Sequence, residues 1–406
     1  MRGLLGLLCA GVVCTGAAFA QEPPAPYPAA PSAPADGAPV PTLIDRPSSE
    51  PDGGGRFFAE VDYLLRWFKP VCETPAVLTI GNPSDRVPGA LGQPGTQVLL
   101  GQGHKFEFPM TPGVQFTLGW DRGDRAVGVE VTGLIMSQAA NGQRFASDAN
   151  GSPHTYLAYQ APDNSFQALP FTVPGVVTGG SMSEGTTKLW GVETELTLPF
   201  ASRSGDCTLY AKFLSGGRYL DLTDRVRVTN VLRLVADPSA VAVGSDLFTT
   251  HNQFAGPELG TTLGVGWGRW SLEYTTKLAA GITHQARDIE GSPVLPGSAI
   301  SPLLVPGPLL ALPSNIGHET ARRVTLVPEV DLKTRVAVTS WCSVSFAYSL
   351  LYWNKVLCPG DQMSPFANIT QLPFHGPFTG APLPQSPLVH TDYYAQGFNF
   401  EIEFSY

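Results

Sequence analysis

Residues 397–406 read GFNFEIEFSY, and this stretch decides the fold of the chain. Aromatic and aliphatic side chains stand at every second position from Phe398 to Tyr406, while asparagine, glutamate and serine fill the positions between them. Successive side chains of a β-strand point to opposite faces. The stretch therefore predicts a strand with one apolar face and one polar, mainly acidic face.

The same period of two recurs along the chain. In the segment that starts at Phe57, for example, Val61 and Tyr63 share a face that lies opposite Glu60 and Asp62. A tilted strand needs roughly 9 to 11 residues to cross a bilayer. The pattern predicts ten such crossing strands, near residues 57–67, 114–120, 127–132, 190–200, 207–220, 253–265, 270–282, 323–333, 342–353 and 394–406.

The connections between these strands alternate between long and short. Long segments follow the odd-numbered strands, at 69–111, 137–185, 223–252, 283–321 and 354–393, and short turns follow the even-numbered ones. Outer-membrane barrels have short periplasmic turns and longer outer loops. We therefore predict an all-β fold, a transmembrane antiparallel up-and-down β-barrel of about ten strands (range roughly 8 to 12), in a Gram-negative-type envelope.

A soluble β-sandwich or lipocalin-like barrel would also alternate, with its apolar face turned inward. Long strands, tryptophans near strand ends and the aromatic C-terminus favour the membrane version. Charged residues make up only 15% of the chain and hydrophobic residues 43%. The last strand resembles the terminal β-signal that the outer-membrane insertion machinery reads, with these apolar positions: Phe400, Ile402, Phe404 and Tyr406.

The N-terminus predicts export followed by a tether. Arg2, an apolar run from Leu4 to Val13, and Ala18-Phe19-Ala20 form the three parts of a cleaved secretory signal, residues 1–20. Residues 21–55 are rich in proline and alanine and predict a periplasmic linker. The barrel domain is then residues 56–406, located in the cell outer membrane and in contact with its lipid.

The polar faces of the strands predict what the barrel encloses. If the apolar faces meet lipid, the lumen receives an acidic excess, which would favour cations in an open pore. The alternative is a filled lumen of paired charges, as in small barrels. The predicted lumen-facing charges are Glu60, Asp62, Arg66, Glu130, Glu193, Glu195, Lys212, Arg218, Glu258, Glu273, Lys277, Arg323, Glu329, Asp331, Glu401 and Glu403.

These two readings give two functions, and a third class is open. A hollow lumen indicates a porin for passive diffusion of small, cationic solutes. A filled lumen indicates a structural or surface-binding envelope protein whose long loops, such as 302–313, bind a partner outside the cell. A surface protease is the remote alternative, with Asp221, Asp224 and His251, or Asp361, His390 and Asp392, as candidate groups.

Other functional classes lack sequence support. HExxH, GxxxxGK[ST] and GxSxG motifs do not occur, so we expect no enzyme and no cofactor. The cysteines lack the close pairing of structural zinc sites, so we expect no metal. The net charge of −9 disfavours nucleic acid. Cys72 and Cys358 both lie just beyond outer strand ends and could form a disulfide, whereas Cys207 and Cys342 lie too far apart around the barrel.

Several short strings resemble a known family. They are 89–96 (GALGQPGT), 189–191 (LWG), 217–222 (GRYLDL), 311–317 (ALPSNIG), 351–353 (LYW) with 359–362 (PGDQ), and 396–400 (QGFNF). Together they are similar to the seventh of the numbered "putative beta barrel porin" families, over about Arg56 to Tyr406. The resemblance implies an outer-membrane location and a barrel architecture, and the family name adds a porin role as an expectation.

Overall fold

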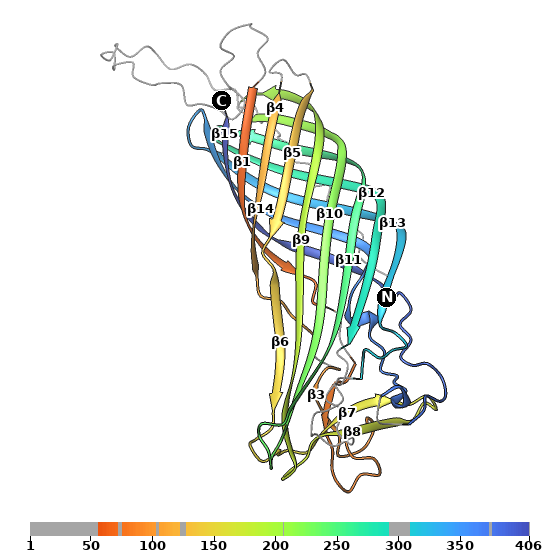
Figure 1. The fold of residues 1–406 in the computed structure, drawn as a ribbon. Coiled ribbons are helices and arrows are strands. Elements are labelled where there is room, and N and C mark those ends of the chain that lie inside the picture. Colours follow the sequence, from red (N-terminus) through yellow and green to blue (C-terminus); the bar gives the residue numbers. More distant parts are fainter. Residues whose placement is uncertain are drawn as a thin grey trace, which may run out of the picture. The chain divides into compact units, whose positions relative to one another are not determined.

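The computed structural model describes residues 56–71, 75–102, 105–121, 127–205, 207–291, 309–372 and 376–405. The predicted signal peptide, the predicted linker, Cys72 and Tyr406 lie outside the described residues. Ten strands form a closed antiparallel barrel in which each strand pairs with the next and the last, β15, pairs with β1 (Figure 1). The barrel fold and its ten crossing strands, as predicted, are confirmed.

The barrel strands, in spatial order, are β1 (Arg56–Phe68), β4 (Thr111–Asp121), β5 (Gly128–Met136), β9 (Val177–Ser204), β10 (Cys207–Leu234), β11 (Val241–Trp267), β12 (Trp270–Gly291), β13 (Gly317–Ala337), β14 (Cys342–Leu357) and β15 (His390–Ser405). Each pairing joins neighbours in sequence apart from short inserted strands, which is the topology of an up-and-down barrel.

The apolar face of each strand points outward over about a dozen residues. On β10, Leu209 and Phe213 are 59% and 53% exposed, while Leu214 between the outward positions is 4% exposed. Outward aromatic residues mark both limits of this band, with Trp267 and Trp270 at the short-turn end and Trp190 and Tyr219 at the other end. We call this surface the lipid band, because its height and aromatic edges fit a bilayer.

Five strands continue far beyond the lipid band. β9 and β10 each have 28 residues, β11 has 27, β12 has 22 and β13 has 21, against the roughly 9 to 11 that a crossing requires. The predicted loop at 223–252 is therefore wrong, because this segment is the end of a long β10–β11 hairpin. The predicted loops at 137–185 and 283–321 are shortened for the same reason.

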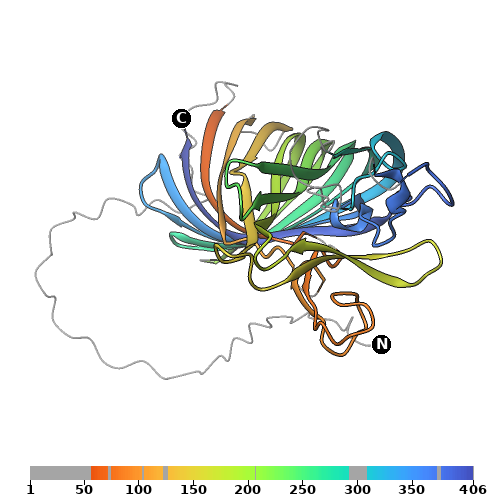
Figure 2. The same cartoon turned by 60° about the horizontal axis from the view of Figure 1, so that its bottom comes forward.

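Beyond the lipid band, the long-loop end forms a folded body that we call the head. It consists of the strand extensions together with residues 69–71, 75–102, 105–110, 137–176, 309–316, 358–372 and 376–389. Its own strands are β2 (Leu78–Ile80), β3 (Gln97–Leu100), β7 (Thr155–Gln160) and β8 (Phe166–Thr172), which form a second sheet, and β6 (Ala139–Ala146), which pairs with β9 (Figures 1 and 2).

Two short 3₁₀ helices, η1 (Gly360–Gln362) and η2 (Ile369–Gln371), lie in the last long connection. Among the described residues, no helix is long and apolar enough to cross a membrane. The inner face of the strand extensions packs against the rest of the head in one apolar core. This core includes Val226, Phe248 and Ile289 from the extensions, Phe171 from β8 and Leu312 from a loop. This core gives the head the burial that a folded body needs.

Candidate functional site in the barrel interior

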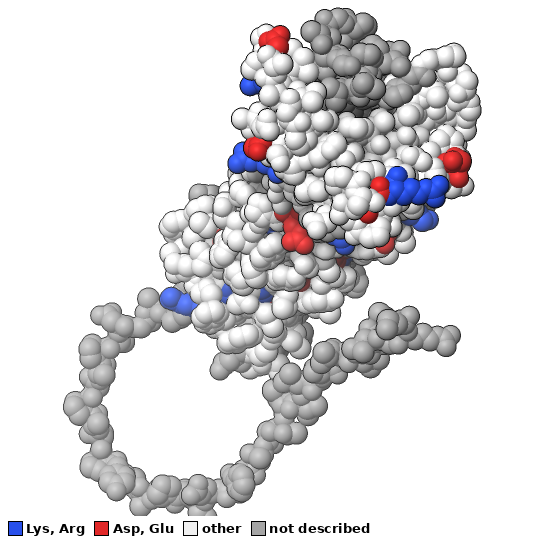
Figure 3. All heavy atoms as spheres, turned by 90° about the horizontal axis from the view of Figure 1, so that it is seen from below, with Lys and Arg blue, Asp and Glu red and all other residues white. Residues whose placement is uncertain are grey.

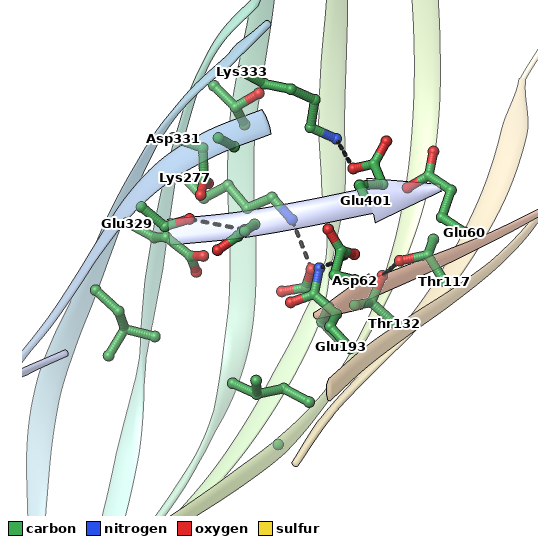
Figure 4. A pocket seen from close by; sticks show the side chains of 18 of the residues that line it. Glu60, Asp62, Thr117, Thr132, Glu193, Lys277, Glu329, Asp331, Lys333 and Glu401 are labelled. Carbon is green, nitrogen blue, oxygen red and sulfur yellow. Dashed lines mark hydrogen bonds and ion pairs between the residues drawn. The ribbon is translucent and has the colours of Figure 1, made fainter. Parts of the chain in front are cut away.

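The charged face of the barrel strands encloses a polar interior with a cavity of about 160 Å³. Acidic and basic side chains from at least seven strands line it, and Figure 4 shows several of them pointing toward one another across the space. Threonine pairs such as Thr117 and Thr132, with hydroxyl oxygens 2.9 Å apart, join neighbouring strands at its wall. The alternation that puts apolar groups in lipid thus puts ionic groups here.

Arg218 of β10 is the centre of the interior network. Its guanidinium contacts Glu193 of β9 at 2.5 Å, Glu258 of β11 at 2.8 Å and Glu329 of β13 at 2.6 Å. The arginine and Glu258 are 4% and 1% exposed. Because two strands separate β10 from β13 in the barrel wall, the contact with Glu329 crosses the lumen.

Two lysines make further contacts across the interior. The Lys277 ammonium of β12 lies 2.7 Å from Glu193 and 3.0 Å from Glu195, both on β9, with β10 and β11 between them in the wall. Lys212 of β10 lies 2.9 Å from Glu130 of β5. These ion pairs connect parts of the wall that no backbone hydrogen bond joins.

A second group of charges lies beside β15. Lys333 is 2.5 Å from Glu401, and Arg335 contacts Glu401 at 3.3 Å and also binds Glu403. The same guanidinium is 3.7 Å from Glu60 and from Glu273. Neither Lys333 nor Arg335 was among the predicted lumen residues, although both continue the face of β13 that carries the predicted acids Glu329 and Asp331. That alternation would have found them.

The structure places most of the predicted lumen charges together. Arg323 is the exception, because it is exposed in the outer part of β13 and does not line the interior. Including Lys333 and Arg335, the interior groups are eleven acids, Glu60, Asp62, Glu130, Glu193, Glu195, Glu258, Glu273, Glu329, Asp331, Glu401 and Glu403, and six bases, Arg66, Lys212, Arg218, Lys277, Lys333 and Arg335.

Carboxylates gather at two places where oxygens of three residues lie within 4.8 Å of one another. One trio is Glu193, Glu195 and Glu258, and the other is Glu60, Glu401 and Glu403. In both trios, basic side chains already contact the carboxylates, as described above. A cation would therefore compete with Lys277 and Arg218 in the first trio, and with Lys333 and Arg335 in the second.

At its outer end, the polar interior is closed by backbone and apolar side chains. After a bulge between Trp353 and Val356, the end of β14 reaches β11, where Asn252 accepts a hydrogen bond from the Leu357 N–H at 2.7 Å and donates to the Leu357 carbonyl at 2.9 Å. β12 and β13 separate β11 from β14 in the wall, so these bonds cross the lumen. Trp353 packs edge-on against Phe254, with ring centroids 6.0 Å apart.

Of the first group considered for hydrolysis, Asp221 and His251 are joined through one hydroxyl group, whereas Asp224 lies apart from them. His251 Nδ1 is 3.1 Å from the Thr223 hydroxyl, which donates to Asp221 at 3.3 Å, all on the outward face. Asp224 is buried on the opposite face of the same strand. In the other proposed group, His390 contacts Gln285 at 3.0 Å, and Asp392 accepts a long 3.5 Å bond from the Lys355 backbone.

The structure tests one of the two cysteine predictions. Cys358 is buried at the start of the last long connection, and its predicted partner, Cys72, lies outside the described residues, so this disulfide stays a prediction. Cys207 and Cys342 both have free thiols. The C-terminal positions Phe400 and Ile402 are 46% and 45% exposed on the lipid band. Their role as an insertion signal stays a prediction.

The chain matches one protein family, described as putative beta barrel porin-7 (BBP7), over residues 58–406. No curated protein matches it. Solved structures of other proteins also match, among them the following three. The outer membrane protease OmpT of Escherichia coli is 9% identical, with 86% of this chain and 97% of that chain covered and a TM-score of 0.43.

The TodX monoaromatic hydrocarbon channel, as a deltaS2 mutant, is 9% identical, with 87% and 90% coverage and a TM-score of 0.22. A Pseudomonas aeruginosa FadL homologue is 8% identical, with 87% and 90% coverage and a TM-score of 0.17.

Proposed function

The chain belongs to the putative beta barrel porin-7 family, and from that premise we propose that it is a barrel with a sealed interior that displays its head outside the cell. It is an outer-membrane β-barrel protein. Its role on this proposal is that of a structural or surface-binding envelope protein, with no enzymatic activity. The observation that carries the proposal is the set of ion pairs across the lumen around Arg218.

These contacts support a closed interior because they use the space that a solute would need. Arg218 and Lys277 together hold acids from β9, β11 and β13 at 2.5–3.0 Å. Removing one member of such a buried group leaves uncompensated charge, at a cost of about 3–5 kcal/mol. A solute could pass only by disrupting several of these contacts at once.

The head supports a surface role. Long connections of outer-membrane barrels face outside, and here they fold into a packed body with its own sheet. The face seen from the head end is mostly uncharged, with a few small groups of basic and acidic residues (Figure 3). Such a surface is suited to contact with other envelope components.

Passive diffusion of cations is the second candidate, and one observation favours it. The cavity of about 160 Å³ is lined by more acids than bases. If the end of β14 moved away from Asn252, rings of carboxylates would favour cations.

Planar-bilayer recording separates the two candidates. A sealed interior predicts no unitary current for the purified protein, with a water-filled porin reconstituted in parallel as the positive control. The double variant Lys277→Met/Glu195→Gln removes both cross-lumen ion pairs of Lys277 and tests whether they contribute to the seal. Steady unitary currents in the unmodified protein would overturn the proposal, and their reversal potential in a KCl gradient would test the cation preference.

Display outside the cell is tested by epitope insertion. Exposed turns tolerate insertions, and the β7–β8 turn at Asn164 lies in the head, whereas the β9–β10 turn at Gly205 lies at the short-turn end. Antibody should bind intact cells with the epitope after Asn164 and not after Gly205. The reverse pattern would show that the head faces the periplasm.

A further inference from the structure

The outward face of β9 and β10 changes chemistry just beyond the lipid band. In the sheet register, Trp190 lies opposite Asp221, and this row of the two strands is the last one that carries an outward aromatic residue. We call it the aromatic row. The next row pairs Lys188 with Thr223, and the row after that pairs Thr186 with Arg225. Lys188 and Arg225 are both exposed, with buried neighbours on either side in sequence, so both side chains point away from the barrel.

These two cations have no ion-pair partner among the described residues. The nearest carboxylate in the register, Asp221, accepts hydrogen bonds from Gln253 at 3.0 Å, Thr223 at 3.3 Å and Tyr219 at 3.4 Å. Further out on the same face, Glu184 stands directly opposite Arg227 in the register and diagonal to Arg225. Lys188 and Arg225 are thus the exposed cations next to the aromatic row that have no carboxylate directly opposite them on the paired strands.

Their surroundings supply neutral hydrogen-bonding groups. Thr186 and Thr249 flank Arg225 on the adjacent strands, and the nearest acid beyond Thr249 in that row, Asp288, already binds His318 at 2.6 Å. Below Lys188, the rings of Trp190 and Tyr219 pack with centroids 5.3 Å apart. Aromatic pairs of this kind sit at the level of lipid headgroups.

Strand geometry places the pair in the headgroup layer. With a rise of roughly 3.3 Å per residue and a tilt of roughly 40°, two residues advance about 5 Å along the membrane normal. Lys188 then lies about 5 Å above the aromatic row, and Arg225 about 10 Å above it. The headgroup layer of one leaflet is roughly 5–8 Å thick, so Lys188 lies within it and the long Arg225 side chain reaches its upper edge.

We propose that Lys188 and Arg225 form a binding site for the phosphate group of an outer-leaflet lipid. An ammonium and a guanidinium on adjacent strands can hold one phosphate from two sides, with the guanidinium binding two of its oxygens. The lipid's apolar part would then lie along Trp190 and Tyr219. The site is independent of whether the barrel interior conducts.

Native mass spectrometry of the full-length protein tests this site. The delipidated protein in detergent is offered phosphatidylglycerol or phosphatidylcholine with the same acyl chains. Each basic residue near a membrane surface contributes about 1 kcal/mol toward an anionic lipid. The double variant Lys188→Gln/Arg225→Gln should therefore lose roughly 30-fold of the preference for phosphatidylglycerol.

The matched control is Arg227→Gln/Arg233→Gln, which removes two positive charges from the same face of β10 but further from the membrane. It should keep the preference within about twofold. Equal loss in both variants would indicate attraction to net charge and would overturn the site, as would no preference in the unmodified protein.

A competition arm separates lipid from free anion. Inorganic phosphate at a large molar excess should leave bound phosphatidylglycerol in place, because the lipid also contacts the aromatic pair. Displacement of the lipid by phosphate alone would make this a free-anion site and overturn the lipid assignment. Heat-modifiable migration in gels confirms that each variant is folded.

Discussion

The lipid band and the head are built from the same strands with opposite polarity. On β10, the outward residues Leu209 and Phe213 lie on the lipid band, whereas further along the same face Arg227 and Arg233 are exposed beyond it. The inward face changes in the opposite sense, from Arg218 to the buried Val226. The period of two is unbroken. The surroundings, and not the backbone, decide which face carries the apolar side chains.

The apolar core of the head and the polar interior of the barrel are also stabilised differently. Burial of apolar area contributes about 25 cal/mol per Å², so the head core of Phe248, Val226 and their neighbours stabilises the head directly. Buried ion pairs often contribute little net stability, because desolvation offsets their attraction. The network around Arg218 instead fixes which strands face one another across the lumen.

The largest effect should come from truncating the head core. Phe248→Ala removes a side chain that is fully buried opposite Val226, and the resulting cavity should cost about 3–5 kcal/mol. Leu247→Ala, one residue away on the outward face, should cost less than about 1 kcal/mol. Denaturant unfolding followed by tryptophan fluorescence in vesicles measures both. Equal effects would mean that the inward face of the head is not its core.

Removing the central arginine should affect the barrel in a comparable range. Arg218→Met leaves Glu193, Glu258 and Glu329 without a shared cation, which should cost about 3–5 kcal/mol in the same unfolding assay. Adding Glu258→Gln should restore part of that loss, because it removes one of the uncompensated charges. An unchanged unfolding free energy of the Arg218→Met variant would indicate that these acids are solvated as in an open pore.

The sequence was sufficient for the barrel because its signal is local. Alternation within one strand, as at Phe57 to Trp67, identifies a crossing strand without knowledge of its neighbours, and all ten such strands are present. The head was not predicted, because the outward positions of β10 become polar at Asp221, Thr223 and Arg225, which resembles the end of a strand. The residues that follow still alternate, with Val226 and Val228 buried.

The interior was predicted as a set of residues and not as a set of contacts. A strand pattern tells which face Glu193 and Lys277 occupy, but their contact depends on barrel closure, which places β9 opposite β12. Arg323 is on the face of β13 that points inward, but it lies too far along the strand to reach the polar interior. The alternation identifies the face of a residue and not its height in the barrel. The closing bonds from Asn252 to Leu357 follow a bulge in β14 that no sequence pattern marked.

A charge placed on the outward face should separate the band from the head. Leu263 and Val243 are outward residues of β11 with similar exposure, 53% and 57%. Leu263→Arg puts a cation near the bilayer midplane and should cost about 2–4 kcal/mol, whereas Val243→Arg should change stability by less than about 0.5 kcal/mol. Urea unfolding in lipid vesicles measures the difference. If Val243→Arg lowered the unfolding free energy as much as Leu263→Arg does, that part of the sheet would lie against lipid or a partner.

The smallest effect concerns a buried acid in the head. Burial raises the pKa of Asp224 to about 7, against roughly 3.9 in an unfolded chain. Between these values the folded head keeps a proton that the unfolded chain has released, so the stability of the head falls as pH rises. The limit for one proton is about 1.4 kcal/mol per pH unit.

Asp224→Asn cannot titrate and serves as the reference. Relative to this variant, the unmodified protein should lose up to about 1.4 kcal/mol of unfolding free energy from pH 5 to pH 6. The loss should level off above pH 7. Hydrogen exchange of the β9–β10 extension at each pH measures the head separately from the barrel. A difference that stays constant over this range would mean that Asp224 is ionised throughout, and that the head interior accommodates a charge as the barrel interior does.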